Sequence, residues 1–156
     1  MKIKVLSLKE PQATLMLLGA KLIETRGWKP LDLKLPARIG IHASAGYPGW
    51  CREMAESQPF RSVLGGRDLR LTLGKILCTV ELVACHSTNN LTCNRDDVIP
   101  FPQEDWYPVL GSNEWYFGDY SPRRQMWLTR DVRALKVPVA AKGALGLWDF
   151  DLQETA

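Results

Sequence analysis

The sequence predicts an α+β fold, built as a small mixed β-barrel flanked by two or more short helices. Apolar and polar residues alternate in several short runs, of which Gly74 to Cys85 is the clearest. Gly and Pro separate these runs, and only two short stretches have helical spacing. Because 156 residues are typical of one domain, we expect residues 1–156 to form a single unit.

The first elements follow from local signals. Residues Lys2–Ser7 alternate weakly, which predicts a short opening strand. Pro11 suits the first turn of a helix, Ala13–Leu18 are strong helix formers, and Gly19 can end the helix in a left-handed conformation. A helix of about two turns therefore follows the first strand.

The same signals predict the rest of the chain. One face of Gly74–Cys85 is apolar and the other mixed, as expected where a sheet borders a cleft or solvent. Residues 87–120 have no sustained periodicity and are expected to form an irregular, aromatic-rich insertion. The other expected elements are a helix within Tyr47–Gln58 and the strands Leu22–Trp28, Ala37–Ala43, Arg123–Leu135, Val137–Ala141 and Gly146–Leu152.

Composition excludes several classes of protein. A hydrophobic content of 46% and a charged content of 24% exclude a disordered or fibrous chain. Residues 1–10 lack the apolar run of a signal peptide, and the longest apolar patch, Ala13–Ala20, is too short to span a bilayer. The expectation is a soluble, cytoplasmic protein without a membrane partner.

The four cysteines do not predict a metal site. They stand at positions 51, 78, 85 and 93, without a Cys-x-x-Cys pair and without a His at zinc-ligand spacing, although His86 adjoins Cys85. Reduced structural thiols are favoured, with no metal and no cofactor.

Charge is distributed unevenly along the chain, although the net charge is only +3. Residues 1–40 hold eight Lys/Arg against three Asp/Glu, and residues 121–143 hold six against one, so each segment carries +5. Residues 87–120 carry −5, from one Arg against six acids. If the basic segments meet in space, they form a patch suited to phosphate; otherwise they are a mixed, solvated surface.

The run from Gly19 to Trp28 concentrates the most chemistry. In an extended strand Glu24, Arg26 and Trp28 project from one face, whereas Ile23 and Thr25 project from the other. A carboxylate, a guanidinium and an aromatic plane suit a flat, polar ligand such as a nucleobase. The alternative is a surface ion pair with Trp28 in the core.

Several motifs resemble those of the ASCH domains, a branch of the PUA-like superfamily. Gly19-Ala-Lys-Leu-Ile-Glu-Thr-Arg-Gly-Trp28 resembles their Gly-x-Lys-x-x-Glu-x-Arg-x-Trp signature. Ile41-His-Ala-Ser44, the strand 74–85 and Gly143-Ala-Leu-Gly-Leu-Trp148 resemble the second, central and closing strands, and residues 118–128 resemble a segment of bacterial and phage members. The motifs keep the family order over about residues 1–150.

The resemblance implies a PUA-like β-barrel with a cleft beside the first helix, lined by the signature. Most members are inferred to bind RNA or other nucleic acid, some deacetylate acetylated cytidine, and ribonuclease activity is attributed to others. Many have Gln-Pro-Trp where this chain has Glu10-Pro11-Gln12, so that aromatic wall of the cleft is absent here, and the candidate substitutes are Trp28 and the aromatics of residues 101–120. The deacetylating branch has Thr at the position of Glu24, which favours binding over catalysis here.

The first functional hypothesis is a module that binds RNA, another nucleic acid, a nucleoside or a nucleotide. Lys21 and Arg26 would hold phosphate or a base carbonyl, Glu24 would accept from an exocyclic amine, and Trp28 would stack. The full set of candidate binding residues is Lys21, Glu24, Arg26, Trp28, His42, Ser44, Arg123, Arg124 and Lys142. His42 is equally compatible with a structural role, and Ser44 lacks the context of a nucleophile elbow.

Two other hypotheses stay open, and whether the protein is an enzyme is undecided. In a hydrolase acting on a modified nucleoside or on RNA, Lys21 would be the base and Glu24 or Glu81 would exchange protons, with His42 in reserve. In a protein-interaction or regulatory module, the aromatic residues of 101–120 would form the contact surface, unless they cover the core. The sequence does not indicate an oligomeric state.

Overall fold

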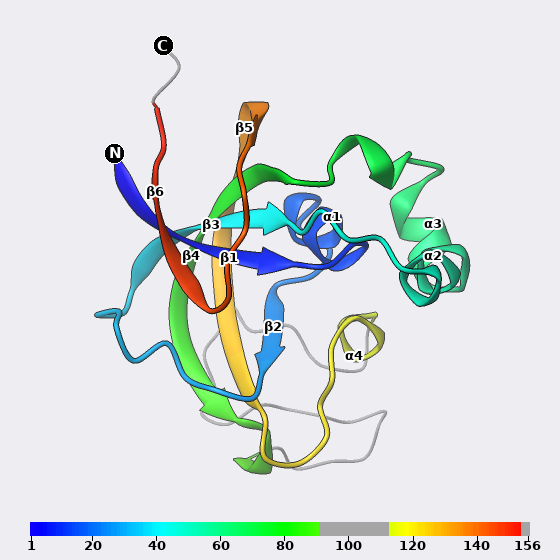
Figure 1. The fold of residues 1–156 in the computed structure, drawn as a ribbon. Helices are drawn as coiled ribbons and strands as arrows, with labels where there is room; N and C mark the ends of the chain where they lie inside the picture. The colour runs from blue at the N-terminus through cyan, green and yellow to red at the C-terminus, as the bar shows by residue number, and fades with distance from the viewer. Residues whose placement is uncertain (91–112, 154–156) are drawn as a thin grey trace.

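The protein is described by a computed structural model, which covers residues 1–90 and 113–153. Six strands form one curled sheet in the order β2-β5-β4-β3-β1-β6, and helix α1 lies beside the ends of β1 and β3 (Figure 1). The strands are β1 (Lys2–Leu8), β2 (Ile23–Arg26), β3 (Ala37–Ala43), β4 (Lys75–Ser87), β5 (Gln125–Ala140) and β6 (Leu147–Asp151). The helices are α1 (Gln12–Leu17), α2 (Gly49–Glu56), α3 (Phe60–Leu64) and α4 (Glu114–Phe117), with short 3-10 turns at Leu69–Leu71 and Thr88–Asn90.

The sheet is mixed, because β1 and β3 run parallel whereas every other neighbouring pair is antiparallel. Helices α2 and α3 lie together to one side of it, and α4 lies near β2 (Figure 1). The predicted α+β class with short helices is confirmed. The predicted small mixed β-barrel is observed as a curled sheet with β2 and β6 at its two edges. No helix in the two described ranges is long and apolar enough to cross a membrane.

Most predicted elements are present, with three differences. Strand β2 ends at Arg26 rather than Trp28. One continuous strand, β5, replaces the predicted pair 123–135 and 137–141, because a left-handed residue at Asp131 (φ 49°) and shifts of register let the strand bend without ending. The one-turn helices α3 and α4 have too little helical periodicity to be predicted.

Helix α1 connects two parts of the core. Its Ala13 and Met16 pack with the buried side chains of β3 and β4 and with the fully buried Trp127 of β5. On its other side Leu15 packs with Phe60 of α3 and Phe117 of α4. Gly19 ends the helical segment with φ of +70°, as predicted. A helix of six residues has little stability of its own, so these contacts on both sides must stabilise it.

The predicted apolar face of β4 is interrupted by a β-bulge. The register with β5 shifts between Ile76 and Cys78, so Leu77 and Cys78 both pack in the core beneath α1, whereas Ile76 packs with Ile3 and Leu152. Strict alternation could not predict an inserted residue.

Cys51 and Cys78 are buried free thiols and Cys85 is half-buried, in agreement with a structural role. Burial raises the pKa of the Cys78 thiol to about 12, so it stays protonated at neutral pH. Cys93 lies outside the described residues.

A buried carboxylate precedes α1. The side chain of Glu10 is fully buried, and Oε1 accepts from the Thr14 amide at 2.8 Å. Oε2 accepts from the hydroxyls of Thr14 and, at 2.8 Å, Thr72. Burial raises the pKa of Glu10, although these three donors oppose the shift.

Glu10→Gln is expected to flatten the dependence of stability on pH. A raised pKa in the folded state means that this group favours folding most below its unfolded pKa, and that the benefit is lost as pH rises through the folded pKa. The substituted amide stays neutral at every pH. The difference in unfolding free energy, variant minus wild type, should therefore become more positive from about pH 4 to about pH 8, as measured by urea denaturation. Exposed Glu53→Gln is the control, and equal slopes for wild type and Glu10→Gln would contradict the prediction.

Candidate ligand-binding cleft

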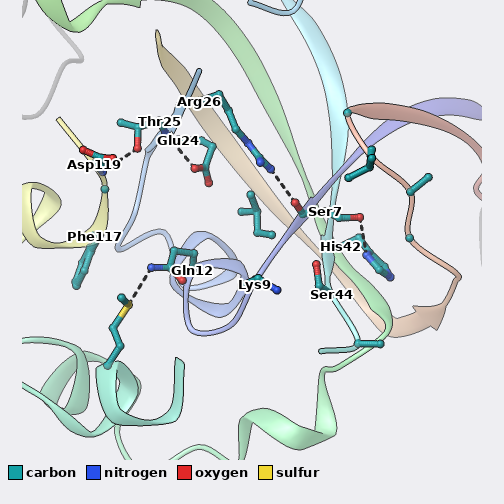
Figure 2. Close-up of a pocket in the computed structure, with 18 of the residues that line it drawn as sticks. Ser7, Lys9, Gln12, Glu24, Thr25, Arg26, His42, Ser44, Phe117 and Asp119 are labelled. Carbon is teal, nitrogen blue, oxygen red and sulfur yellow. Dashed lines mark hydrogen bonds between the residues drawn. The ribbon is translucent and has the colours of Figure 1, made fainter. Parts of the chain in front are cut away.

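A cavity of about 850 Å³ opens beside α1, between the sheet and helices α2 and α4. Figure 2 shows side chains from distant parts of the sequence pointing into it. The lining comes from the end of β1, from β2, from the end of β3 and from the β5–β6 connection, with α1, α2 and α4 adding residues. Of the predicted binding residues, it includes Glu24, Arg26, His42, Ser44, Arg124 and Lys142.

Glu24 and Arg26 lie on the cavity side of β2, as predicted (Figure 2). The Glu24 side chain is 8% exposed, and its Oε1 accepts from the Thr25 amide at 3.0 Å. Arg26 Nη2 donates to the Ser7 carbonyl at 2.8 Å. Among the described residues, buried Glu24 Oε2 and buried Arg26 Nε have no hydrogen-bond partner. Leaving such atoms unsatisfied is costly, so they are available to a ligand.

Ser7, His42 and Ala141 of the lining belong to a chain of hydrogen bonds that begins at Trp148. Trp148 Nε1 donates to Ser7 Oγ at 3.0 Å, Ser7 Oγ lies 2.9 Å from His42 Nδ1, and His42 Nε2 lies 2.9 Å from the Ala141 carbonyl. A carbonyl can only accept, so Nε2 carries a proton, and in the neutral ring Nδ1 accepts from the Ser7 hydroxyl. His42 is 1% exposed and packs edge-on against Trp148. The chain therefore fixes the histidine ring.

Gly143 packs tightly against this chain. A Cβ added there would lie 2.8 Å from His42 Cε1 and 2.9 Å from Ser7 Oγ. No larger residue fits without moving the ring or the backbone, so the β5–β6 connection can approach this closely only with glycine.

Lys21 lies beneath the cleft rather than in it. Its side chain is fully buried, and Nζ donates to the carbonyls of Ile23 at 2.5 Å and Phe117 at 3.0 Å. Glu114, 3% exposed, accepts from the amides of Leu22 and Ile23. Burial raises the pKa of Glu114, and the charge of Lys21 and the two amides oppose that shift. Together Lys21 and Glu114 attach α4 to the start of β2.

The far end of α4 is attached to β2 as well. The Asp119 amide donates to Thr25 Oγ1 at 2.8 Å, so Thr25, predicted to face away, reaches the edge of the cavity. Arg124 Nη2 donates to the Thr25 carbonyl at 3.1 Å, and Arg124 Nε lies 3.4 Å from Asp119 Oδ2. Hydrogen bonds from Ser121, with Arg124 nearby, lower the pKa of Asp119.

The two basic segments of the sequence meet at this cavity. Lys9 and Arg26 come from the first segment, and Arg124 and Lys142 come from the second. Against these four cations the lining holds two acids, Glu24 and Asp119, which leaves a net charge of +2. The lining of the cavity is therefore positively charged overall. Glu24 is the more buried of its two carboxylates.

Aromatic side chains contribute to the cavity, but Trp28 does not. Two residues past the end of β2, Trp28 leaves the alternation of the strand and packs edge-on against Trp127, with ring centroids 4.8 Å apart. Trp50 of α2 and Tyr116 of α4, 53% and 51% exposed, line the cavity together with buried Phe117. Trp28 is 38% exposed, so it neither lines the cavity nor lies in the core, the two placements that the sequence left open.

Two further predicted residues lie away from the cavity. Glu81 on β4 pairs with Arg130 of β5 at 2.9 Å, and this hydrogen bond lowers the pKa of Glu81. Arg123 is exposed in the turn before β5. Of the predicted catalytic residues Lys21, Glu24 and Glu81, only Glu24 lines the cavity.

The described part of the aromatic segment mostly covers the core. Trp115 stacks on Tyr120 with ring centroids 5.3 Å apart, and Phe117 packs against Phe60 at 5.1 Å. Phe101, Trp106 and Tyr107 lie outside the described residues. The described contacts favour core cover over an interaction surface.

Several contacts in and beneath the cleft could not be predicted from the sequence. Ser7 meets His42 because the two are register partners on parallel strands β1 and β3. Nothing local signals the pairing of Lys21 with α4, about ninety residues later. The position of Trp50 could have been predicted. Pro48 and Gly49 precede it, and the helical spacing that follows places Trp50 in the first turn of α2.

Comparison with known proteins gives matches among solved structures. No family model matches the sequence, and no curated protein matches it. Among solved structures, the chain is similar to the crystal structure of ASCH from Zymomonas mobilis, with 20% identity and a TM-score of 0.48 over 88% of this chain and 72% of that chain.

Proposed function

We propose that the cleft binds a nucleobase of RNA or of a related nucleotide. The observation that carries this proposal is the pair of buried, unpartnered atoms in the cavity, Glu24 Oε2 and Arg26 Nε. One accepts a hydrogen bond and the other donates one. Because they stand two residues apart on one strand, about 6–7 Å separates their Cα atoms.

A nucleobase is complementary to such a pair. The edge of a base presents amino or imino donors next to carbonyl or ring-nitrogen acceptors, and side chains read these edges in single-stranded RNA. An exocyclic amine would donate to Glu24 Oε2, and a base oxygen or nitrogen would accept from Arg26 Nε. A purely anionic ligand could pair with the cations of the lining but would offer no donor to Glu24 Oε2.

The remainder of the lining suits the other parts of a nucleotide. Exposed Trp50 and Tyr116 offer planes on which a base can stack. Lys9, Arg124 and Lys142 can contact phosphate, which is the main source of affinity for nucleic acid. The resemblance of the Gly19–Trp28 run to the ASCH signature also supports RNA.

Glu24→Gln is expected to weaken binding about 5- to 150-fold, because the new amide presents a donor where the base also presents one, at a cost of about 1–3 kcal/mol. Binding of the four 5′-ribonucleotides and of short single-stranded RNAs is measured by calorimetry and fluorescence anisotropy. Glu53→Gln, an exposed change of the same charge on α2, is the control and should leave affinity unchanged.

Two results would refute the proposal. One is a wild-type protein that binds none of these ligands at low salt. The other is an equal affinity for Glu24→Gln and Glu53→Gln, which would mean that the base does not contact Glu24.

A further inference from the structure

A second cavity, of about 660 Å³, lies among α2, α3 and the turn Leu69–Leu71. It has no part in the proposed base contacts. Four arginines line it: Arg52 of α2, Arg61 of α3, and Arg67 and Arg70 beyond α3. The acidic residues of the lining are Glu56 and Asp68.

Three of these arginines have no ionic partner within the described part of the chain. Asp68 is taken by Arg70, with Nε 3.0 Å from Oδ1, and that hydrogen bond lowers the pKa of Asp68. Arg52, Arg61 and Arg67 are exposed and form no ion pair with a described residue. Glu56 alone remains against three free guanidinium groups, so the cavity is positively charged.

Helix α2 separates this arginine cavity from the cleft. Trp50 and Met54, four residues apart, line the cleft, whereas Arg52 and Glu56, also four apart, line the arginine cavity. Residues at this spacing share one side of a helix, so the two pairs lie on different sides of α2. A helix with its side chains is about 10–12 Å wide, a distance that an extended oligonucleotide can cross.

We infer that the arginine cavity binds backbone phosphates of the same single-stranded nucleic acid whose base occupies the cleft. Arginine forks match phosphate oxygens in a bidentate geometry. The exposed ring of Trp50, at the boundary between the cavities, gives the intervening base a surface on which to stack. This combination of aromatic and cation favours nucleic acid over an acidic protein segment. The inference rests on the proposed function.

The test compares a triple variant, Arg52→Gln with Arg61→Gln and Arg67→Gln, with a control that removes the same charge elsewhere. The control is Lys2→Gln with Lys34→Gln and Lys136→Gln, all exposed and outside both cavities. Each protein is titrated with a 5′-ribonucleotide and with a single-stranded RNA of about ten nucleotides, at several salt concentrations.

The arginine variant should keep the mononucleotide affinity of the wild type and bind the RNA at least about tenfold more weakly. Its slope of log K against log salt should be shallower by about 2, because each phosphate contact in a single strand contributes about 0.7. The control should keep the wild-type slope.

An equal loss of RNA affinity in both triple variants would overturn the inference, since only overall charge would then matter. Competition by polyglutamate as effective as that by RNA would also overturn it, because an acidic protein segment would then be the better partner. If RNA affinity falls in the arginine variant but not in Glu24→Gln, the result would support the arginine cavity and refute the proposed base site. If RNA affinity falls in Glu24→Gln but not in the arginine variant, only the role of the arginine cavity would be refuted.

Discussion

Lys21→Met is expected to lower the free energy of unfolding by about 3–5 kcal/mol, the usual cost of removing one partner from a buried set of charges. The change removes the donor to the carbonyls of Ile23 and Phe117 and leaves Glu114 without the nearby positive charge. Methionine keeps much of the side-chain volume, so the loss reports polar contacts rather than an empty space. Urea denaturation at pH 7 measures it.

Two further variants make this prediction specific. Exposed Lys34→Met should change stability by no more than about 0.5 kcal/mol. The double variant Lys21→Met with Glu114→Gln should lose less stability than the sum of the losses in the two single variants, by about 0.5–3 kcal/mol. Additive effects would show that Lys21 and Glu114 act independently, and a loss for Lys21→Met as small as that for Lys34→Met would contradict the assigned role.

Gly143→Ala is expected to destabilise the protein by about 1–3 kcal/mol through overpacking, and to weaken ligand binding as well. The added methyl group would lie 2.8 Å from His42 Cε1 and 2.9 Å from Ser7 Oγ. The ring cannot turn away without losing its hydrogen bonds to Ser7 and Ala141, so the β5–β6 connection has to move outward. That connection carries Lys142 at the cavity.

Gly27→Ala is the matched control for this change. A Cβ there meets no atom within 4 Å, and the backbone is not left-handed. Urea denaturation and nucleotide titration of both variants provide the measurement. If the two alanine variants were equally stable and bound equally well, the close packing of Gly143 on His42 would have no energetic consequence.

Local patterns predicted the parts of the fold that depend on nearby residues. The bounds of β3 and the left-handed Gly19 after α1 followed from alternation and from a helix-ending glycine. The shared face of Glu24 and Arg26 also followed, because both lie within one strand. Trp28 was wrongly placed because alternation applies only while the strand continues, and pairing with β5 stops at Arg26.

The rest of the cleft depends on contacts between distant segments. Ser7 and His42 meet only because β1 and β3 are parallel neighbours in a particular register. Lys21 looked like a ligand-binding or catalytic lysine in the sequence, and its burial depends on Glu114 and α4, which the pattern of residues 87–120 did not reveal. Charge counting predicted which segments were basic, but the fold decided that they share a cavity.

The short helix α4 links ligand binding to local unfolding. One turn of helix has little stability of its own, so the wall formed by Tyr116 and Phe117 depends on its anchors on β2 and on the packing of Phe117 against Phe60. Releasing that wall requires loss of the Glu114 and Lys21 contacts but leaves the strand pairing of the sheet intact. The backbone amides of Leu22 and Ile23 donate hydrogen bonds to Glu114. Their protons are expected to exchange with solvent when the wall is released. The exchange rates of these two amides therefore report how often the cleft opens on this side.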